Sequence, residues 1–494
     1  MTIPTDIYHI LKNQGPKSSS EVREILVREF DISSDAATQR ISRAKPPINK
    51  IKGWLPRNEA YLYLDKHRRT HSFERNFYKK LLEKKSVYGI ALASVISRGG
   101  IINESEFYCI TGSPYNLKKQ TSGEKLKRGL LDEGFITSQN NPLMGASLIV
   151  TPALFNSQKE SAIRARLITE EIFISLLKEW LEKNCYIAND LAKYRGVDIE
   201  SNRKVGQFSW DIESPSYLRP LKGGVFPVKK PGFVVCDVLF RSRVTDHALS
   251  AFIKKIKIFE QTANSGSLFP MFIAYHFEKE AFNFAKSEGV LITTPQNLFG
   301  KEVGDSLNEI MVLFKTALEK TTPEMIESFI EKTTKYYEKF STLKGYAFEL
   351  ICAHLSNYSL NGSIYLQKII NVNGKQKEID IMNVENNNKS IIFIEAKSKE
   401  RDNLVTAEEV RDWKEKTDVI NQWLKEPENA SYRESSIKHE LWVNTDLDVE
   451  AKEEFKKIKS GKKEYLFVNG SDIRKISTSS KINKGISDAL KNYF

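Results

Sequence analysis

The sequence contains few of the residues and motifs that mark several common protein classes. Its four cysteines, at positions 109, 185, 236 and 352, lie more than forty residues apart and form no Cys-x-x-Cys pair, which argues against a disulfide framework and a cysteine zinc site. The seven histidines include no His-Glu-x-x-His, and the chain has neither a Gly-x-x-x-x-Gly-Lys-Ser/Thr loop nor a Gly-x-Gly-x-x-Gly turn. Zinc hydrolysis, NTP-driven work and dinucleotide redox chemistry are therefore disfavoured.

Long apolar runs are also missing. No window of about 18 apolar residues occurs in the 494-residue chain, so the sequence predicts no membrane span. The first residues lack a basic stretch followed by an apolar core and a cleavage site. With 40% hydrophobic and 28% charged residues, we expect a soluble, globular, multidomain protein in the cytoplasm.

Positive charge is in excess, mainly near the N-terminus. The chain has a formal net charge of +12, and residues 1–150, with 24 basic and 15 acidic side chains, carry +9 of it. Because lysine and arginine neutralise phosphates, this excess favours a nucleic-acid partner. The alternative is a solvated surface with a slight lysine excess.

The first 150 residues predict two successive sets of three helices and a hairpin. In the first, Ser18–Ser20 and Ser33–Asp35 cap helices that follow a short helix over 5–14, and strand-like runs flank a turn at 55–58. In the second, helices are expected over 73–84, 88–97 and 122–133, with two strands after Gly134.

Both sets resemble winged-helix domains, with SDAATQRISRAK and SGEKLKRGLLDEGFI as the candidate recognition helices. The resemblance implies binding to double-stranded DNA, since a helix fits the major groove. The alternative is that one or both sets only pack against neighbouring parts or dimerise. The side chains expected to face DNA are Gln39, Arg40, Arg43, Lys45, Lys125, Lys127 and Arg128.

The sharpest pattern lies in the C-terminal third, where a predicted helix (345–355) precedes two predicted strands. Alternation along the second strand places Glu395 and Lys397 on one face. Buried charges of this kind need a partner or a metal ion, and Asp380 on the preceding strand can complete the cluster.

Phosphodiester hydrolysis is the chemistry that uses this set. Asp380 and Glu395 supply the hard oxygen ligands that Mg²⁺ prefers, with Mn²⁺ as a possible substitute. Lys397 would orient or deprotonate the attacking water, or neutralise the scissile phosphate. Glu349, on the helix, would be a further ligand or a base behind the ligands.

Asp380, a gap of 14 residues and then Glu395-x-Lys397 resemble the PD-(D/E)xK, or restriction-endonuclease-like, superfamily. The resemblance covers about residues 340–480 and implies a mixed sheet flanked by helices and Mg²⁺-dependent DNA cleavage. It places Asp380, Glu395 and Lys397 in the catalytic triad and Glu349 at the helix glutamate of many members. Ile379 stands where the motif has proline. The alternative is a surface pair, Glu395 with Lys397, in a structural domain.

The middle of the chain repeats this order without the lysine. The segment VGQFSWDI lines up with GKQKEIDI, so that Asp211 falls on Asp380, and FVVCDVLF places Asp237 on Glu395 and Leu239 on Lys397. We expect a degenerate copy that serves as a scaffold, contacts DNA or dimerises. The alternative is a second active site with a lysine from the following helix, such as Lys254 or Lys257.

The sequence thus predicts a multidomain α/β chain with N-terminal α+β winged-helix units. The expected parts are 1–72 and 73–155 (winged helices), 160–300 (degenerate copy), 301–340 (helical linker) and 341–494 (nuclease). The expected function is a DNA endonuclease of a restriction, defence or repair type that uses no NTP and dimerises at least on DNA. Two rivals remain: a non-catalytic DNA-binding regulator or assembly factor, and an RNA nuclease.

Overall fold

The chain is a multidomain α/β protein with several sheets and many helices, which confirms the fold class at this level. The computed structural model describes residues 5–68, 70–118, 120–195, 204–218, 221, 231–241, 243–262, 266–319, 322–360, 362–458, 463–478 and 484–494. The contacts divide the chain into two compact units. Unit 1 comprises residues 1–139, 148–158 and 185–293, and unit 2 comprises residues 140–147, 159–184 and 294–494.

Unit 1 begins with three helices and a small antiparallel sheet of order β1-β3-β2. Ser18 caps α2 in a capping box with Glu21, which fixes where that helix starts. The apolar faces of the helices pack on β3 through fully buried side chains such as Leu11, Leu26 and Leu62. The elements are α1 (Thr5–Gln14), β1 (Lys17–Ser18), α2 (Ser19–Phe30), α3 (Ser34–Arg43), β2 (Ile48–Ile51), the 3-10 turn η1 (Pro56–Asn58) and β3 (Tyr61–Leu64).

A second set of helices and a sheet of order β4-β6-β5 follow. An aromatic core holds this part together, and within it Trp54 stacks on Tyr88 with ring centroids 4.0 Å apart. The elements are α4 (Asp65–Arg68), α5 (His71–Glu83), α6 (Val87–Ser97), β4 (Ile101–Asn103), η2 (Glu104–Glu106), α7 (Phe107–Thr111), α8 (Gly123–Asp132), β5 (Ile136–Asn141) and β6 (Gly145–Val150).

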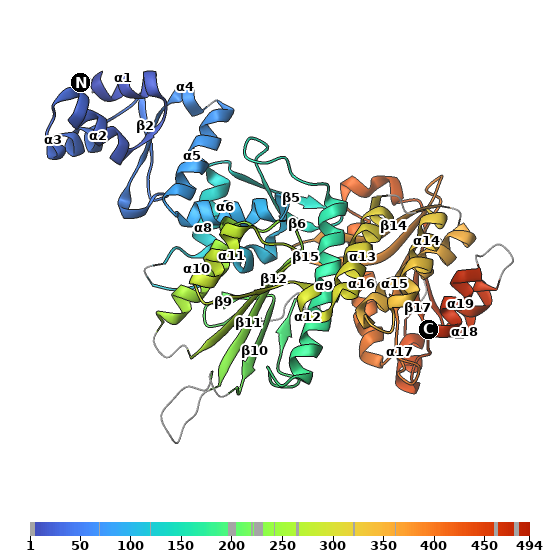
Figure 1. Cartoon of the computed structure of the whole chain (residues 1–494). Helices are drawn as coiled ribbons and strands as arrows, with labels where there is room; N and C mark the ends of the chain where they lie inside the picture. Colours follow the sequence, from blue (N-terminus) through green and yellow to red (C-terminus); the bar gives the residue numbers. More distant parts are fainter. Residues whose placement is uncertain are drawn as a thin grey trace. The chain divides into compact units, whose positions relative to one another are not determined.

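The rest of unit 1 is built on a five-stranded mixed sheet of order β13-β12-β11-β10-β7, part of which is green in Figure 1. Strands β11, β12 and β13 run parallel, whereas β10 is antiparallel to both of its neighbours. Helix α10 packs its apolar face on β11 and β12. The elements are β7 (Lys193–Tyr194), β8 (Lys204–Val205), β9 (Phe208–Ser209), β10 (Ile212–Ser216), β11 (Gly232–Leu239), α10 (Asp246–Glu260), β12 (Leu268–Ala274), α11 (Lys279–Ser287) and β13 (Leu291–Thr293).

Unit 2 contains a second five-stranded mixed sheet, of order β14-β15-β16-β17-β18. Its elements are α9 (Glu160–Lys183), α12 (Pro295–Phe299), α13 (Lys301–Glu319), α14 (Pro323–Thr333), η4 (Thr334–Tyr336), α15 (Ser341–Leu360), β14 (Gly362–Val372), β15 (Lys375–Glu385), β16 (Ser390–Lys397), α16 (Ala407–Trp423), η5 (Pro427–Tyr432), β17 (Ser436–Val443), α17 (Val449–Lys456), β18 (Lys463–Val468), α18 (Gly470–Ser477) and α19 (Lys484–Tyr493). The contacts of α9 with α13 and α15 place it in unit 2, although the sequence order suggests the start of the middle domain. The finer five-part division remains a prediction.

The two mixed sheets share one topology and one register. In each, an antiparallel pair leads into three parallel strands. Ile212 pairs with Cys236 in unit 1, and Ile381 pairs with Ile394 in unit 2. The internal repeat that the sequence suggests is therefore present in the strand order of the described residues.

Candidate functional site

Two adjacent strands of unit 2 bring Asp380 and Glu395 together. Because Ile381 on β15 pairs with Ile394 on β16, the neighbouring positions Asp380 and Glu395 lie beside each other. The backbone N–H of Ala396 donates to Asp380 Oδ2 over 2.9 Å and fixes that carboxylate. The sequence prediction that these two acidic groups cluster at the sheet is thus matched by their positions.

Lys416 on α16 occupies the space between the two carboxylates. Its Nζ lies 2.9 Å from Asp380 Oδ1 and also hydrogen-bonds to Glu395 Oε2. Burial alone would lower the pKa of Lys416, but the charges of Asp380 and Glu395 outweigh it and raise the pKa above its usual range. Two oxygens from different strands therefore face a single position that suits a cation.

Burial also changes the titration of Glu395. It raises the pKa of this carboxyl group, and the charge of Asp380 raises it further, against the lowering effect of Lys416 and Lys397. A cation at the shared position offsets the repulsion between two such closely spaced acidic groups.

Lys397 lies at the C-terminal end of β16 and contacts neither carboxylate by a hydrogen bond or ion pair. Its Nζ is 3.9 Å from Glu409 Oε1, and Lys399 approaches the same oxygen to 2.6 Å. The side chain of Lys397 is 26% exposed. The predicted triad is therefore present on one sheet, with Lys416 in contact with both carboxylates and Lys397 on the more accessible side.

Glu349 on α15 lies behind the two strands. It accepts a hydrogen bond from Gln367 Nε2 over 3.2 Å. Burial raises its pKa well above the usual range, and the charges of Asp380 and Glu378 raise it further. The charge of Asp380 thus acts on Glu349, which agrees with the expectation that Glu349 lies near the acidic cluster.

Arg164 on α9 adds a cation that the sequence analysis does not identify. Its Nη2 lies 2.8 Å from Glu378 Oε2, and its Nε donates to Gln367 Oε1 over 3.3 Å. Arg164 lies more than two hundred positions before both partners in the sequence, and only the packing of α9 within unit 2 brings it near them.

A parallel cluster occupies the same place in the sheet of unit 1. Val238 N donates to Asp211 Oδ2 over 2.8 Å, as Ala396 N does to Asp380. Lys255 Nζ lies 2.6 Å from Asp237 Oδ2 and donates to the carbonyl oxygen of Ser209 over 2.9 Å. Neither of the two lysines suggested from the sequence fills this role: Lys254 has no such contact, and Lys257 instead pairs with Glu288 at 2.6 Å.

The lysines at the two clusters occupy equivalent helical positions. Thr245 caps α10 and Thr406 caps α16, and Lys255 and Lys416 each lie ten residues after the capping threonine. The preceding valines, at 244 and 405, form matching parallel bridges. Alignment of these Val-Thr pairs is the sequence signal that would have found both lysines.

The two clusters differ in how far their side chains are exposed to solvent. The side chains of Asp380, Glu395 and Lys416 are 15–16% exposed, whereas those of Asp211, Asp237 and Lys255 are at most 5% exposed. The positions of Lys397 and Glu409 are taken by Leu239 and Ala248, both of which are buried. The cluster in unit 1 is thus buried, with Arg195 Nε 3.2 Å from Asp211 Oδ1 as a further ion pair, and the cluster in unit 2 is partly open.

Glu106 and Cys109 lie beside Asp211 in unit 1. Ligand atoms of Glu106, Cys109 and Asp211 lie within 4.8 Å of one another. Burial raises the pKa of the Cys109 thiol, with a smaller raising effect from Asp237 and Asp211 and a lowering one from Lys255. Burial therefore favours the neutral form of this thiol.

The residues predicted to face DNA differ in their surroundings. Arg40 pairs with Asp6 on α1, and Lys127 pairs with Glu104 at 3.0 Å and Glu124 at 3.2 Å. The remaining predicted residues are exposed on the surface: Gln39, Arg43, Lys45, Lys125 and Arg128.

Comparisons with known proteins give no family. No protein-family model matches the chain, and no curated protein matches it. Among solved structures, a crystal structure of the protein of unknown function AF1548 aligns with 28% of this chain and 73% of its own, at 13% identity and a TM-score of 0.20. Among the described residues, no helix has the length and apolar character needed to cross a membrane.

Proposed function

We propose that the chain is a metal-dependent DNA endonuclease of a restriction, defence or repair type, with its active centre in unit 2. The observation that carries this proposal is the convergence of Asp380 and Glu395 on one partly exposed cation position, with Lys416 and Lys397 beside it. Phosphodiester hydrolysis uses this combination of hard acidic ligands and positive charge.

The donor set fits Mg²⁺, with Mn²⁺ as a substitute. Asp380 Oδ1 and Glu395 Oε2 both contact the ammonium group of Lys416, so these oxygens can share one cation. Asp380 and Glu395 would hold the divalent ion, which lowers the pKa of a water molecule and stabilises charge on the phosphoryl group.

The side chains around the carboxylates supply the other functions. Lys397, at the accessible end of β16, is placed to orient a water molecule or to neutralise the scissile phosphate. Lys416, once released from the carboxylates, provides a second positive charge. Arg164 holds Glu378 and Gln367, and Gln367 in turn holds Glu349, so these residues fix the wall behind the ligands.

The other parts have supporting roles in this proposal. The two N-terminal sets of helices and small sheets act as winged-helix domains that bind double-stranded DNA. The sheet of unit 1, with its enclosed Asp211, Asp237 and Lys255, acts as a restriction-endonuclease-like scaffold without catalysis. The enzyme works in the cytoplasm and without NTP.

Cleavage of supercoiled plasmid and of single-stranded DNA with Mg²⁺ or Mn²⁺ tests the proposal. We expect Asp380→Asn and Lys397→Ala to lower the cleavage rate by at least about 10²-fold, the usual range for loss of such a group. Lys438→Ala is the control, because Lys438 lies on the neighbouring strand β17 and, among the described residues, forms its ion pair with Glu464. Wild-type protein that leaves every DNA whole with both metals would contradict a nuclease.

The rival function is that of a DNA-binding regulator or assembly factor. A measurement of metal binding distinguishes it from the nuclease. If the carboxylates hold a divalent ion, Mg²⁺ or Mn²⁺ raises the melting temperature by mass action, and Asp380→Asn removes the shift. A melting curve that is indifferent to both metals favours the rival. Cleavage of RNA in preference to DNA would instead favour the RNA nuclease.

A further inference from the structure

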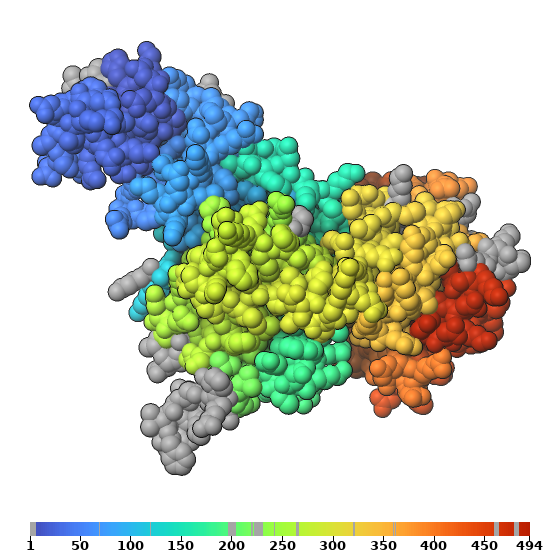
Figure 2. Space-filling view, in the orientation of Figure 1, coloured from blue at the N-terminus to red at the C-terminus, as the bar shows by residue number. Residues whose placement is uncertain are grey.

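A cationic hollow of about 890 Å³ opens on the N-terminal part of unit 1. It lies between the first turns of α2, the exposed side of α3, strand β2 and the 56–60 turn. Figure 2 shows the surface of these N-terminal residues in dark blue. The lining residues are Ser19, Ser20, Arg23, Thr38, Ile41, Ser42, Lys50, Lys52, Pro56, Arg57, Asn58, Glu59, Ala60 and Lys84.

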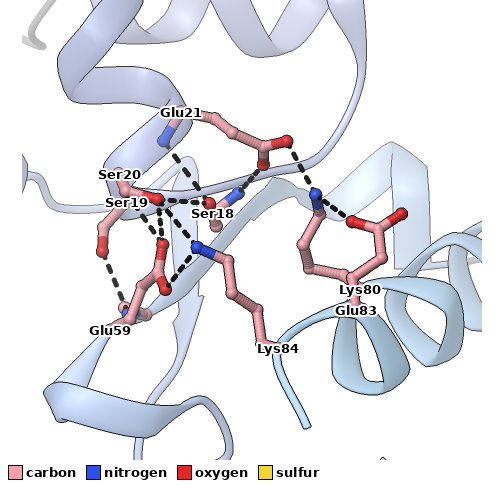
Figure 3. Close-up of polar contacts among 9 residues, drawn as sticks. Ser18, Ser19, Ser20, Glu21, Glu59, Lys80, Glu83 and Lys84 are labelled. Carbon is pink, nitrogen blue, oxygen red and sulfur yellow. Dashed lines mark hydrogen bonds and ion pairs between the residues drawn. The ribbon is translucent and has the colours of Figure 1, made fainter.

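The lining carries far more positive than negative charge. Its cationic side chains are Arg23, Lys50, Lys52, Arg57 and Lys84, and its one acidic side chain is Glu59. Glu59 is already engaged: it accepts hydrogen bonds from the backbone and hydroxyl groups of Ser20 and lies 3.2 Å from Lys84 Nζ (Figure 3). One of the five cations is thus neutralised within the wall.

The other four have no acidic partner among the described residues. No ion pair of Arg23, Lys50, Lys52 or Arg57 is formed with any described carboxylate. Lys50 Nζ donates to the carbonyl oxygen of Ser42 over 2.8 Å, which holds it against the wall. Burial lowers the pKa of Lys50, and the charge of Lys52 lowers it further, so an anion in the hollow would relieve this repulsion.

The 56–60 turn places a further cation, Arg57, at the hollow. Arg57 has a φ of 57°, in the left-handed region, which is uncommon for a residue other than glycine, asparagine or aspartate and carries strain. Its side chain is exposed at the hollow. A glycine would suit this backbone better, yet the position holds an arginine.

The lining composition identifies the class of anion. None of the described lining residues is aromatic, so the hollow lacks the stacking platforms on which proteins bind the bases of single strands. Several cations spread along one wall instead match a row of phosphates. Hydroxyl groups of Ser19 and Ser42 add hydrogen-bond donors of the kind that contact phosphate oxygens.

We propose that the cationic hollow binds the phosphodiester backbone of duplex DNA. This inference rests on the proposed function and deepens it, because it moves the main contact away from the helix face expected from the sequence. On α3, Thr38 and Ser42 line the hollow, whereas Gln39, Arg40 and Arg43 do not. Contacts of this kind are insensitive to base sequence and weaken with salt.

The test measures DNA binding without cleavage. The full chain carrying Lys397→Ala is titrated with a fluorescent 20-base-pair duplex in EDTA, over a series of salt concentrations. Lys50→Ala with Lys52→Ala should raise Kd roughly 10- to 100-fold and lower the salt slope by about two, since each lost phosphate contact removes about one. Arg57→Gly should lower the slope by about one and keep or raise the melting temperature, because it relieves the backbone strain.

The control and the contrary outcomes are specific. Lys12→Ala with Lys79→Ala removes two exposed cations of the same unit that do not line the hollow. If the hollow variants bind DNA as this control does, the inference is wrong. Duplex RNA or a 20-nucleotide single strand that binds as tightly as duplex DNA would also overturn it. Cleavage is measured separately, with Lys397 intact and with metal. Normal binding by the hollow variants, with cleavage by the otherwise wild-type chain, rejects the inference alone. Weakened binding by these variants, with no cleavage by the wild-type chain, rejects the nuclease alone.

Discussion

The ammonium groups of Lys416 and Lys255 occupy equivalent helical positions, but their partners and their exposure differ. Lys416 is partly exposed and bridges Asp380 and Glu395. Lys255 is fully buried beside Asp237. Because an enclosed ion pair loses several kcal/mol of stability when one partner is removed, the cluster of unit 1 is committed to its internal partner. In the function that we propose, the more exposed cluster of unit 2 exchanges Lys416 for a divalent cation from solution.

His354 gives a residue-scale prediction about pH. It is fully buried on α15, neither ring nitrogen has a hydrogen-bond partner among the described residues, and Nε2 lies 3.6 Å from Glu327 Oε1. Burial lowers the pKa of His354, against a smaller raising effect of Glu327 and Glu324. The unfolded chain therefore binds more protons than the folded one, so stability is complete above about pH 6.5 and is lost as the pH falls below it.

Thermal unfolding from pH 8 to pH 5 checks this expectation. His354→Leu should flatten the decline below pH 6.5, where one such group contributes up to about 1.4 kcal/mol per pH unit. His247→Gln, at an exposed histidine, should leave the decline unchanged. Equal slopes in the wild type and in His354→Leu would show that His354 is not the group that titrates.

At the scale of elements, helix placement decides which lysine reaches which carboxylate. A capping threonine starts each of α10 and α16, and ten residues of helix then carry a lysine to the adjacent strands. In unit 1 the position of α10 also depends on close packing against Gly112, which ends α7. A Cβ atom at Gly112 would lie 2.3 Å from the carbonyl oxygen of Ala251 on α10.

Gly112→Ala should therefore destabilise the protein by about 2–5 kcal/mol. Its φ of 63° costs an alanine about 1–2 kcal/mol, and the clash with α10 adds about 1–3 kcal/mol of overpacking. Gly134→Ala is the matched control, since Gly134 has a φ of 72° and nothing within 4 Å of a Cβ atom. Chemical denaturation compares the two. Equal losses would mean that the contact with α10 carries no constraint.

At the scale of the whole molecule, two sheets with one topology contain one open cluster and one enclosed cluster. If only the open cluster of unit 2 cuts, as we propose, a single chain has one active centre. A double-strand break then needs two chains or two separate visits. We therefore expect a homodimer at least on DNA.

Mixed subunits test this expectation. Wild-type protein is mixed with an equal amount of Lys397→Ala, and the products of supercoiled plasmid are followed on gels. Roughly half of randomly formed symmetric dimers would contain one inactive centre, so nicked plasmid should increase relative to linear. The contrary outcome is a strict monomer that makes concerted double-strand breaks. Such a monomer would require a second active centre. The sheet of unit 1 with Asp211 and Asp237 would then not be a silent copy.

Local sequence patterns determined much of the fold and part of the candidate site. Capping serines and threonines, turn residues and alternating strands predict most helices and strands, because these signals act over a few residues. Asp380, Glu395 and Asp237 could be placed on their sheets because a strand alternates its faces with a fixed period. The repeat of strand order also follows from such local patterns.

Only the tertiary structure decided the partners of these groups. Lys416, Lys255 and Arg164 lie on helices whose packing brings them to strands at a distance in sequence, and periodicity on a helix does not say what its face will meet. Packing between separate segments also sets the different burial of the two clusters. It likewise forms the cationic hollow between α2, α3 and the 56–60 turn. The sequence by itself determined which residues carry charge and which strands hold them, whereas the fold determined which charges meet and which stay open to solvent.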